Sequence, residues 1–283
     1  MRLGGPVFDD HSDPEQFAKA HVNKGYRAAF VPNGLMAAQT DRIRAYRDAL
    51  AAHDVVLAEV GAWCNPLSKD ENTAKEAFEH IVERLTLADE LGACTCVNII
   101  GSGHPNHWYG PDGTNFTEAF FDCAVDIYRK VIDAVKPKNT KMSFELMPYC
   151  FLDSAGEYAR FLKAVDRKEA AVHFDPANMI NCPRLFYDNA AFFKDAIELL
   201  GSRIVSIHLK DLVLHADPPA VHFEEVPIGT GGLHYPELLR NLAALPVDIP
   251  VMLEHLPDEK TYDFAAGNLR RFAGEAGVAF QHY

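Results

Sequence analysis

Four acidic or histidine side chains recur near the ends of four short apolar segments in the second half of the chain. They are Glu145 in KMSFELMP, Asp175 in AAVHFDPAN, His208 in IVSIHLKD and Glu254 in IPVMLEHL. Three carboxylates and one imidazole are a ligand set that suits Mn²⁺, Mg²⁺, Co²⁺ or Zn²⁺. Without an ion, three crowded carboxylates would repel and raise one another's pKa values. The pattern therefore favours one divalent metal ion over four separate ion pairs.

The strands that must carry these side chains alternate their residues between two faces, so Ser206, His208 and Lys210 share one face. Apolar runs alternate with amphipathic segments along the whole chain, which predicts a single (β/α)8 TIM barrel, one domain over residues 1–283. The strand ends of a parallel barrel meet at one rim, so the four residues converge. An open doubly wound sheet is the alternative, but no GxGxxG follows the first strand.

Each of the eight predicted strands is followed by a predicted helix. The strands are Leu3–Phe8, Tyr26–Val31, Val55–Ala62, Thr95–Ile100, Met142–Met147, Ala171–Asp175, Ile204–Lys210 and Val251–Glu254. The helices are Pro14–Asn23, Gln39–His53, Asn72–Leu91, Thr117–Val135, Ser154–Ala164, Asn189–Leu200, Tyr235–Leu245 and Tyr262–Ala273.

Composition limits the partners. The 283 residues carry a net charge of −13, which argues against nucleic acid or an anionic membrane, because phosphates are bound by Lys and Arg. No segment has the pattern of a signal peptide or the length of a transmembrane helix. The six cysteines form no CxxC pair, which indicates a cytoplasmic protein with reduced thiols. Cys94 and Cys96 are interpreted as small buried side chains rather than a metal or redox pair.

Glu145, the FDPAN segment with Asp175, the HLKD segment with His208 and Glu254 together resemble the xylose-isomerase-like barrel superfamily. This is the sugar isomerase/epimerase group that includes the ketose 3-epimerases, and the resemblance covers essentially the whole chain. It implies Mn²⁺ as the first choice of metal, with Mg²⁺, Co²⁺ or Zn²⁺ as alternatives. It also implies that Glu145 and Glu254 form an acid/base pair. A homo-oligomer, dimer or tetramer, would fit the same resemblance.

The expected reaction is the isomerisation or epimerisation of a small polyhydroxy carbonyl compound. The metal would stabilise the enediolate that forms when the α-proton leaves. A lyase, dehydratase or hydrolase of the same superfamily is the alternative, since the first step can be identical. Asn178 stands where the ketose 3-epimerases carry a histidine, and their arginine after the strand-seven histidine is missing. Asn178, the lack of an Asp-x-His pair in the strand-seven loop and the net charge of −13 also argue against a DNA-cleaving relative.

Candidate substrate contacts come from the strand ends and from two long loops, residues 101–116 and 212–234, on the same side of the barrel. His173 is interpreted as a core or supporting residue, and His255 as outward-facing. The orientation of Glu59 stays open. Residues 229–232 are interpreted as a plain turn, with phosphate binding as the alternative. The predicted substrate-binding residues are Trp63, Asn65, His104, Trp108, Asn178, Lys210, His222 and Glu225.

Overall fold

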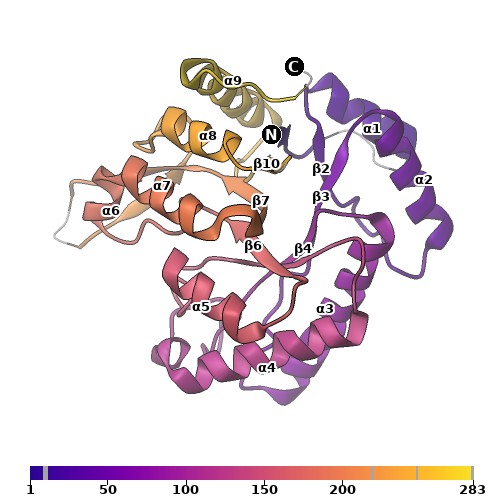
Figure 1. Ribbon diagram of the computed structural model, residues 1–283, viewed down its shortest axis with the longest axis vertical. Helices are drawn as coiled ribbons and strands as arrows, with labels where there is room; N and C mark the ends of the chain where they lie inside the picture. The colour runs from indigo at the N-terminus through magenta and orange to yellow at the C-terminus, as the bar shows by residue number, and fades with distance from the viewer. Residues whose placement is uncertain (9–11, 218–219, 247, 282–283) are drawn as a thin grey trace.

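The fold is a closed barrel of parallel strands surrounded by helices, as the computed structural model shows (Figure 1). The structure describes residues 1–8, 12–217, 220–246 and 248–281. Around the barrel the strand order is β1-β10-β7-β6-β5-β4-β3-β2, which confirms the predicted (β/α)8 architecture. The barrel strands are β1 (Arg2–Gly4), β2 (Ala28–Phe30), β3 (Val56–Gly61), β4 (Thr95–Ile99), β5 (Met142–Glu145), β6 (Ala170–Phe174), β7 (Ile204–Leu209) and β10 (Pro250–Leu253).

The register of these strands places each candidate ligand within two residues of the ligand on the neighbouring strand. Glu145 pairs with His173 across β5 and β6, and His208 pairs with Met252 across β7 and β10. Asp175 and Glu254 lie directly beyond the ends of β6 and β10. The four residues therefore meet at the carboxyl-end rim, where TIM barrels form their active sites.

The helices pack their apolar faces on the outside of the barrel (Figure 1). Several begin at side chains that accept a backbone N–H: Asp13 from Gln16 at 2.8 Å, Thr117 from Phe120 at 3.3 Å and Ser154 from Glu157 at 3.3 Å. Such caps satisfy N–H groups that have no partner inside the helix. The long helices are α1 (Pro14–Asn23), α2 (Thr40–Ala52), α3 (Glu71–Leu91), α4 (Glu118–Val135), α5 (Ala155–Val165), α7 (Asn189–Leu200), α8 (Tyr235–Ala243) and α9 (Glu259–Ala276).

Three parts of the fold differ from the prediction. The first strand ends at Gly4 rather than at Phe8, because Pro6 has no N–H to donate to a neighbouring strand. The loop after β7 contains an antiparallel hairpin of β8 (Asp211–Leu214) and β9 (Phe223–Val226). A short helix, α6 (Pro183–Tyr187), precedes α7.

Gln281 lies beside Met1, since its backbone N–H donates to the carbonyl of Met1 at 2.9 Å. Within the described residues, no helix combines the length and the apolar character that spanning a membrane requires.

The cysteines allow a direct test of burial. All six are free thiols, with Cys123 exposed and Cys96 and Cys150 buried. Burial raises the pKa of Cys94 to about 11 and that of Cys150 to about 12. A raised thiol pKa leaves less thiolate at a given pH, so at pH 8 about 1 in 10⁴ Cys150 thiols would be ionised.

We expect iodoacetamide to label native Cys123 quickly and Cys94 and Cys150 hardly at all, as measured by peptide mass spectrometry. All six should react in urea, and labelling of native Cys150 at the rate of Cys123 would contradict the described packing.

Candidate metal centre

The four predicted ligands form one compact cluster. Ligand atoms of Glu145, Asp175, His208 and Glu254 all lie within 4.8 Å of one another. Asp175 is 0% exposed and His208 is 2% exposed, so the cluster is largely shielded from water. Backbone geometry fixes part of it, because the N–H of Asn178 donates to Asp175 Oδ1 at 3.0 Å. The side-chain amide of Asn178 also donates to Glu145 Oε1 at 3.3 Å.

Electrostatics couple His208 to the glutamates. His208 Nδ1 lies 2.8 Å from Glu254 Oε2 and 3.4 Å from Glu145 Oε1. Burial by itself would lower the pKa of His208, but the charges of Glu254 and Glu59 outweigh it and raise that pKa well above its usual value. Burial would likewise raise the pKa of Glu254, yet His208 and Lys210 hold it well below its usual range. Glu254 is therefore ionised at neutral pH.

Asp175 behaves differently from Glu254. Its complete burial raises its pKa to about 7, although Lys210 acts in the opposite direction. A proton and a metal ion would therefore compete for Asp175 near neutral pH, because metal ligands must be deprotonated.

Lys210 is a buried cation inside the cluster. Its Nζ lies 2.7 Å from Asp175 Oδ2 and 3.7 Å from Glu225 Oε1, and it also donates to Glu254 Oε1. Burial would lower the pKa of Lys210, but Asp175 and Glu254 raise it well above its usual value. An ion pair of Lys210 with Asp211 or another nearby acid is the alternative to substrate binding that its sequence position suggests, and these contacts are with acids other than Asp211. Asp211 instead accepts backbone N–H groups from Leu212, Gly229, Gly231 and Leu233.

The donor set fits a divalent ion. Glu145, Asp175 and Glu254 supply carboxylate oxygens, and His208 supplies an imidazole nitrogen. These three acids and Glu225 outnumber the basic side chains that contact them, which are His208, Lys210 and His255. A bound cation would neutralise that excess, so the residues present suit a metal such as Mn²⁺ or Mg²⁺.

A cavity of about 1160 Å³ opens above the cluster. Trp63 stands over the centre, with its ring centroid 6.3 Å from that of His208. Gly61 permits this position, because a Cβ there would lie 2.2 Å from Trp63 Nε1. The predicted substrate residues that line the cavity are Trp63, Trp108, Asn178, Lys210, His222 and Glu225.

Two predicted contacts lie outside the cavity lining. The amide of Asn65 donates to the carbonyl of Ser102 at 2.7 Å and accepts the N–H groups of Ser102 and Leu67. Asn65 thus ties two loops together, with both ends of its amide in use. His104 accepts the N–H of Asn106 at 3.2 Å within its own loop. The structure does not bring either side chain to the candidate metal centre.

The glycine N–H groups of the turn at residues 229–232 are hydrogen-bonded within the protein. Gly229 and Gly231 both donate to Asp211 Oδ2 at 3.0 Å, and Gly232 donates to the carbonyl of Leu212 at 2.9 Å. This arrangement supports the plain turn and offers no free N–H from these glycines to a phosphate.

The prediction that His255 faces outward is wrong. The strand β10 ends at Leu253, and His255 adopts a left-handed backbone with φ of 55°, so strand alternation no longer applies. His255 Nδ1 lies 2.8 Å from Glu225 Oε2, and its Nε2 lies 3.6 Å from Glu254 Oε2. Phe30, at the end of β2, and Tyr109, in the loop after β4, also line the cavity without having been predicted, since single aromatic residues carry no distinctive pattern.

Comparison with known proteins agrees with this architecture. A crystal structure of D-psicose 3-epimerase from Clostridium cellulolyticum H10, with D-tagatose, superposes with a TM-score of 0.67 at 16% identity, covering 99% of this chain and 100% of that one. A probable 3-DHS dehydratase, AsbF from Bacillus anthracis, gives 0.67 at 14% identity over 94% and 96% of the two chains. A xylose isomerase-like TIM barrel protein from Mycobacterium smegmatis, in complex with magnesium, gives 0.66 at 15% identity over 96% and 95%. At these identities the likeness establishes the fold.

A search of curated proteins finds no match to the chain. The sequence model of one family does match, and it spans residues 19–272. This protein therefore belongs to the family of xylose isomerase-like TIM barrels.

Proposed function

We propose that the protein is a divalent-metal-dependent isomerase or epimerase of a small polyhydroxy carbonyl compound, with Mn²⁺ as the first choice of metal. The observation that carries the proposal is the convergence of Glu145, Asp175, His208 and Glu254 within 4.8 Å. All of these except the fully buried Asp175 line a large cavity. The structural likeness to the magnesium complex and to D-psicose 3-epimerase is in keeping with it.

In this proposal Glu145 and Glu254 move the proton. They come from β5 and from the end of β10, which are separated around the barrel by β6 and β7. A substrate carbon held between them would present one face to each carboxylate. One glutamate would remove the α-proton, and the other would return a proton to the opposite face. Glu254, ionised next to His208 and Lys210, is in the form that a base requires.

The bound metal would supply a positive charge that polarises the carbonyl and stabilises the negative charge left by the departing proton. The chain contributes the rest of the binding. Trp63, Trp108 and Tyr109 offer aromatic faces for stacking against a sugar. The cavity volume of about 1160 Å³ lies above the usual range of small-molecule sites. A substituted sugar would therefore fit as well as a free one.

A lyase or dehydratase reaction is the second candidate, and His255 is the observation that favours it. The hydrogen bond that His255 donates to Glu225 raises the pKa of His255, so its imidazole is protonated over a wider pH range beside Glu254. An acidic group there could protonate a leaving hydroxyl after the first proton transfer. The structural likeness to a probable 3-DHS dehydratase is in keeping with this candidate.

Metal binding is the first expected result. Chelator-treated protein should take up about one Mn²⁺ per chain, and the ion at about 100 times its Kd should stabilise the fold by about 2.7 kcal/mol. Calorimetric titration and thermal unfolding would measure both. Asp175→Asn is the matched variant, because it keeps the shape of the side chain but removes a charged ligand. Uptake well below one ion per chain would contradict the proposal.

Catalysis needs its own test. The Mn²⁺-loaded protein should exchange the hydrogen next to the carbonyl of a ketose with D₂O, which proton NMR follows directly. A panel of ketoses that includes D-tagatose, together with oxidised and glycosylated sugars, would serve as substrates. A protein that binds the ion yet exchanges no such hydrogen across the panel would rule out proton abstraction.

A further inference from the structure

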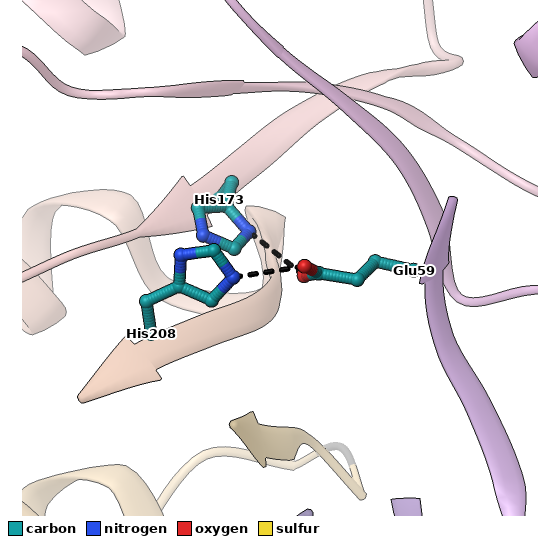
Figure 2. Close-up of side chains that lie close together, drawn as sticks. All are labelled: Glu59, His173 and His208. Atoms are coloured by element: carbon teal, nitrogen blue, oxygen red, sulfur yellow. Dashed lines mark hydrogen bonds and ion pairs between the residues drawn. The ribbon is translucent and has the colours of Figure 1, made fainter. Parts of the chain in front are cut away.

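Directly below the candidate metal centre lie three buried side chains from three different strands. Glu59 comes from β3, His173 from β6 and His208 from β7, and Figure 2 shows both imidazoles directed toward the Glu59 carboxylate. They are 2%, 0% and 2% exposed, respectively. His208 also belongs to the metal centre, so Glu59 and His173 are in direct contact with a predicted metal ligand.

The two nitrogens of His208 face different carboxylates. Nδ1 points to the metal centre, 2.8 Å from Glu254 Oε2 and 3.4 Å from Glu145 Oε1. Nε2 points inward, 2.8 Å from Glu59 Oε1. An imidazole that binds a metal through one nitrogen usually donates the N–H of the other to a carboxylate or carbonyl, which fixes its tautomer and its orientation. Glu59 stands where such a partner is required.

Glu59 is itself held in place. Ser206 Oγ donates to Glu59 Oε2 at 2.9 Å, so one oxygen faces Ser206 while the other faces His208. His173 packs edge-on against His208, with ring centroids 4.1 Å apart and an interplanar angle of 79°. This contact restricts rotation of the His208 ring. A buried serine, a carboxylate and a second imidazole thus fix the position of one ligand.

The same trio could instead hold a second cation, because Glu59, His173 and His208 have ligand atoms within 4.8 Å of one another. Both nitrogens of His173 are also without a hydrogen-bond partner among the described residues, although Nδ1 lies 3.6 Å from Glu59 Oε2 (Figure 2). His208 Nε2 and Glu59 Oε1 are 2.8 Å apart, however, and Ser206 already donates to the other oxygen. That separation is typical of a hydrogen bond. A cation there would require His208 to lose the Nε2 proton while Nδ1 also bound metal.

We propose that Glu59 is a positioning residue that keeps the proton of His208 on Nε2 and thereby leaves Nδ1 free to bind the metal. This inference rests on the proposed metal-dependent function and adds a residue that the four-ligand pattern did not contain. The sequence offered one signal, an isolated acid in the otherwise apolar strand VLAEVG.

The test compares Mn²⁺ affinity in the wild type and in Glu59→Gln. Glutamine keeps the size of the side chain and one acceptor oxygen but loses the charge, so we expect the Kd for Mn²⁺ to rise about 10- to 100-fold. Glu59→Asp keeps the charge and should lose less affinity. Ser206→Ala removes one hydrogen bond to Glu59 and should weaken binding about 2- to 10-fold.

Ser143→Ala is the matched control for Ser206→Ala. Ser143 is also a fully buried serine in a barrel strand, but its hydroxyl is paired with Thr95 at 2.7 Å and not with Glu59. Its Mn²⁺ affinity should equal that of the wild type. Unfolding curves recorded without metal would show that each variant folds.

A second readout reports the tautomer directly. In protein labelled with ¹⁵N-histidine and loaded with ¹¹³Cd²⁺, the coupling to cadmium should appear at His208 Nδ1, with a proton retained on Nε2. Cadmium coupling at Nε2, or an unchanged Mn²⁺ Kd in folded Glu59→Gln, would overturn the inference. Two ions per wild-type chain, one of them lost in Glu59→Gln, would overturn it in favour of a second cation site. A wild type that binds no ion would overturn the proposed function itself.

Discussion

Replacement of Glu145 or Glu254 by glutamine is expected to lower the interconversion of any accepted substrate by about 10²- to 10⁴-fold, the usual contribution of a general acid or base. Glutamine keeps the shape of each side chain and an oxygen for the metal, but it cannot take up a proton. The loss should persist at saturating Mn²⁺, with the bound ion counted in the same sample, so that weaker metal binding is separated from lost proton transfer.

The pattern of isotope exchange distinguishes epimerase from isomerase. If each glutamate serves one face of the substrate carbon, Glu145→Gln should still exchange the α-hydrogen of one epimer, and Glu254→Gln that of the other. If one glutamate both removes and returns the proton, one variant should lose exchange altogether while the other keeps it. Deuterium incorporation into each purified substrate, followed by NMR, separates the two patterns.

Glu224→Gln is the control for these variants. Glu224 is a neighbouring glutamate that pairs with His215 in the β8–β9 hairpin, and its side chain is 56% exposed. Interconversion by this variant should match the wild type. The acid/base pair would be refuted if either Glu145→Gln or Glu254→Gln, loaded with metal, interconverted substrate at the wild-type rate.

The sequence predicted the parts of this molecule that strand alternation and strand order determine. Glu145, Asp175 and His208 lie within or directly after barrel strands, where side-chain direction follows a period of two and parallel strand ends share a rim. Their convergence within 4.8 Å follows from that regularity. The barrel helices were equally regular, and apart from α9 each begins and ends within two residues of its predicted limits.

The errors lie where the chain leaves a regular strand. His255 turns into the cavity because its left-handed backbone ends the alternation one residue after Glu254. The hairpin of β8 and β9 was interpreted as a loop because Asp211 organises it through backbone N–H groups distant in sequence, a pattern that periodicity does not contain. Asn65 was assigned to substrate on residue type, whereas its amide joins two loops. A role can therefore be assigned to a polar side chain at the rim only when its hydrogen-bond partners are known.

Lys210→Met is expected to lower the free energy of unfolding of the metal-free protein by about 3–5 kcal/mol, because it removes one partner of a buried ion pair. Lys210 is 2% exposed and lies 2.7 Å from Asp175 Oδ2. Its loss would leave Asp175 and Glu254 beside each other without the ammonium group between them. Urea unfolding, followed by tryptophan fluorescence in the presence of a chelator, would measure the change.

Lys24→Met is the matched control. Lys24 also lies between two acids, 2.6 Å from Glu259 Oε1 and 2.9 Å from Asp263 Oδ1, but it lies at the surface of the protein. Exposed ion pairs contribute up to about 1 kcal/mol, so this variant should lose no more than that. A Lys210→Met variant as stable as Lys24→Met would show that the buried ammonium does not hold the acids together.

The pH dependence of the Lys210→Met effect follows from Asp175. The pKa of Asp175 is already raised to about 7, above its value in the unfolded chain, so its contribution to stability is fully present at low pH and is lost as pH rises toward 7. Removing Lys210 takes away a charge that lowers this pKa, so the loss of stability should be smaller at pH 5 than at pH 8.

Mn²⁺ should restore more stability to the variant than to the wild type, because a divalent ion would replace the missing positive charge next to Asp175 and Glu254. If Mn²⁺ raised the free energy of unfolding equally in the wild type and in Lys210→Met, the ion and the ammonium group would not neutralise the same carboxylates.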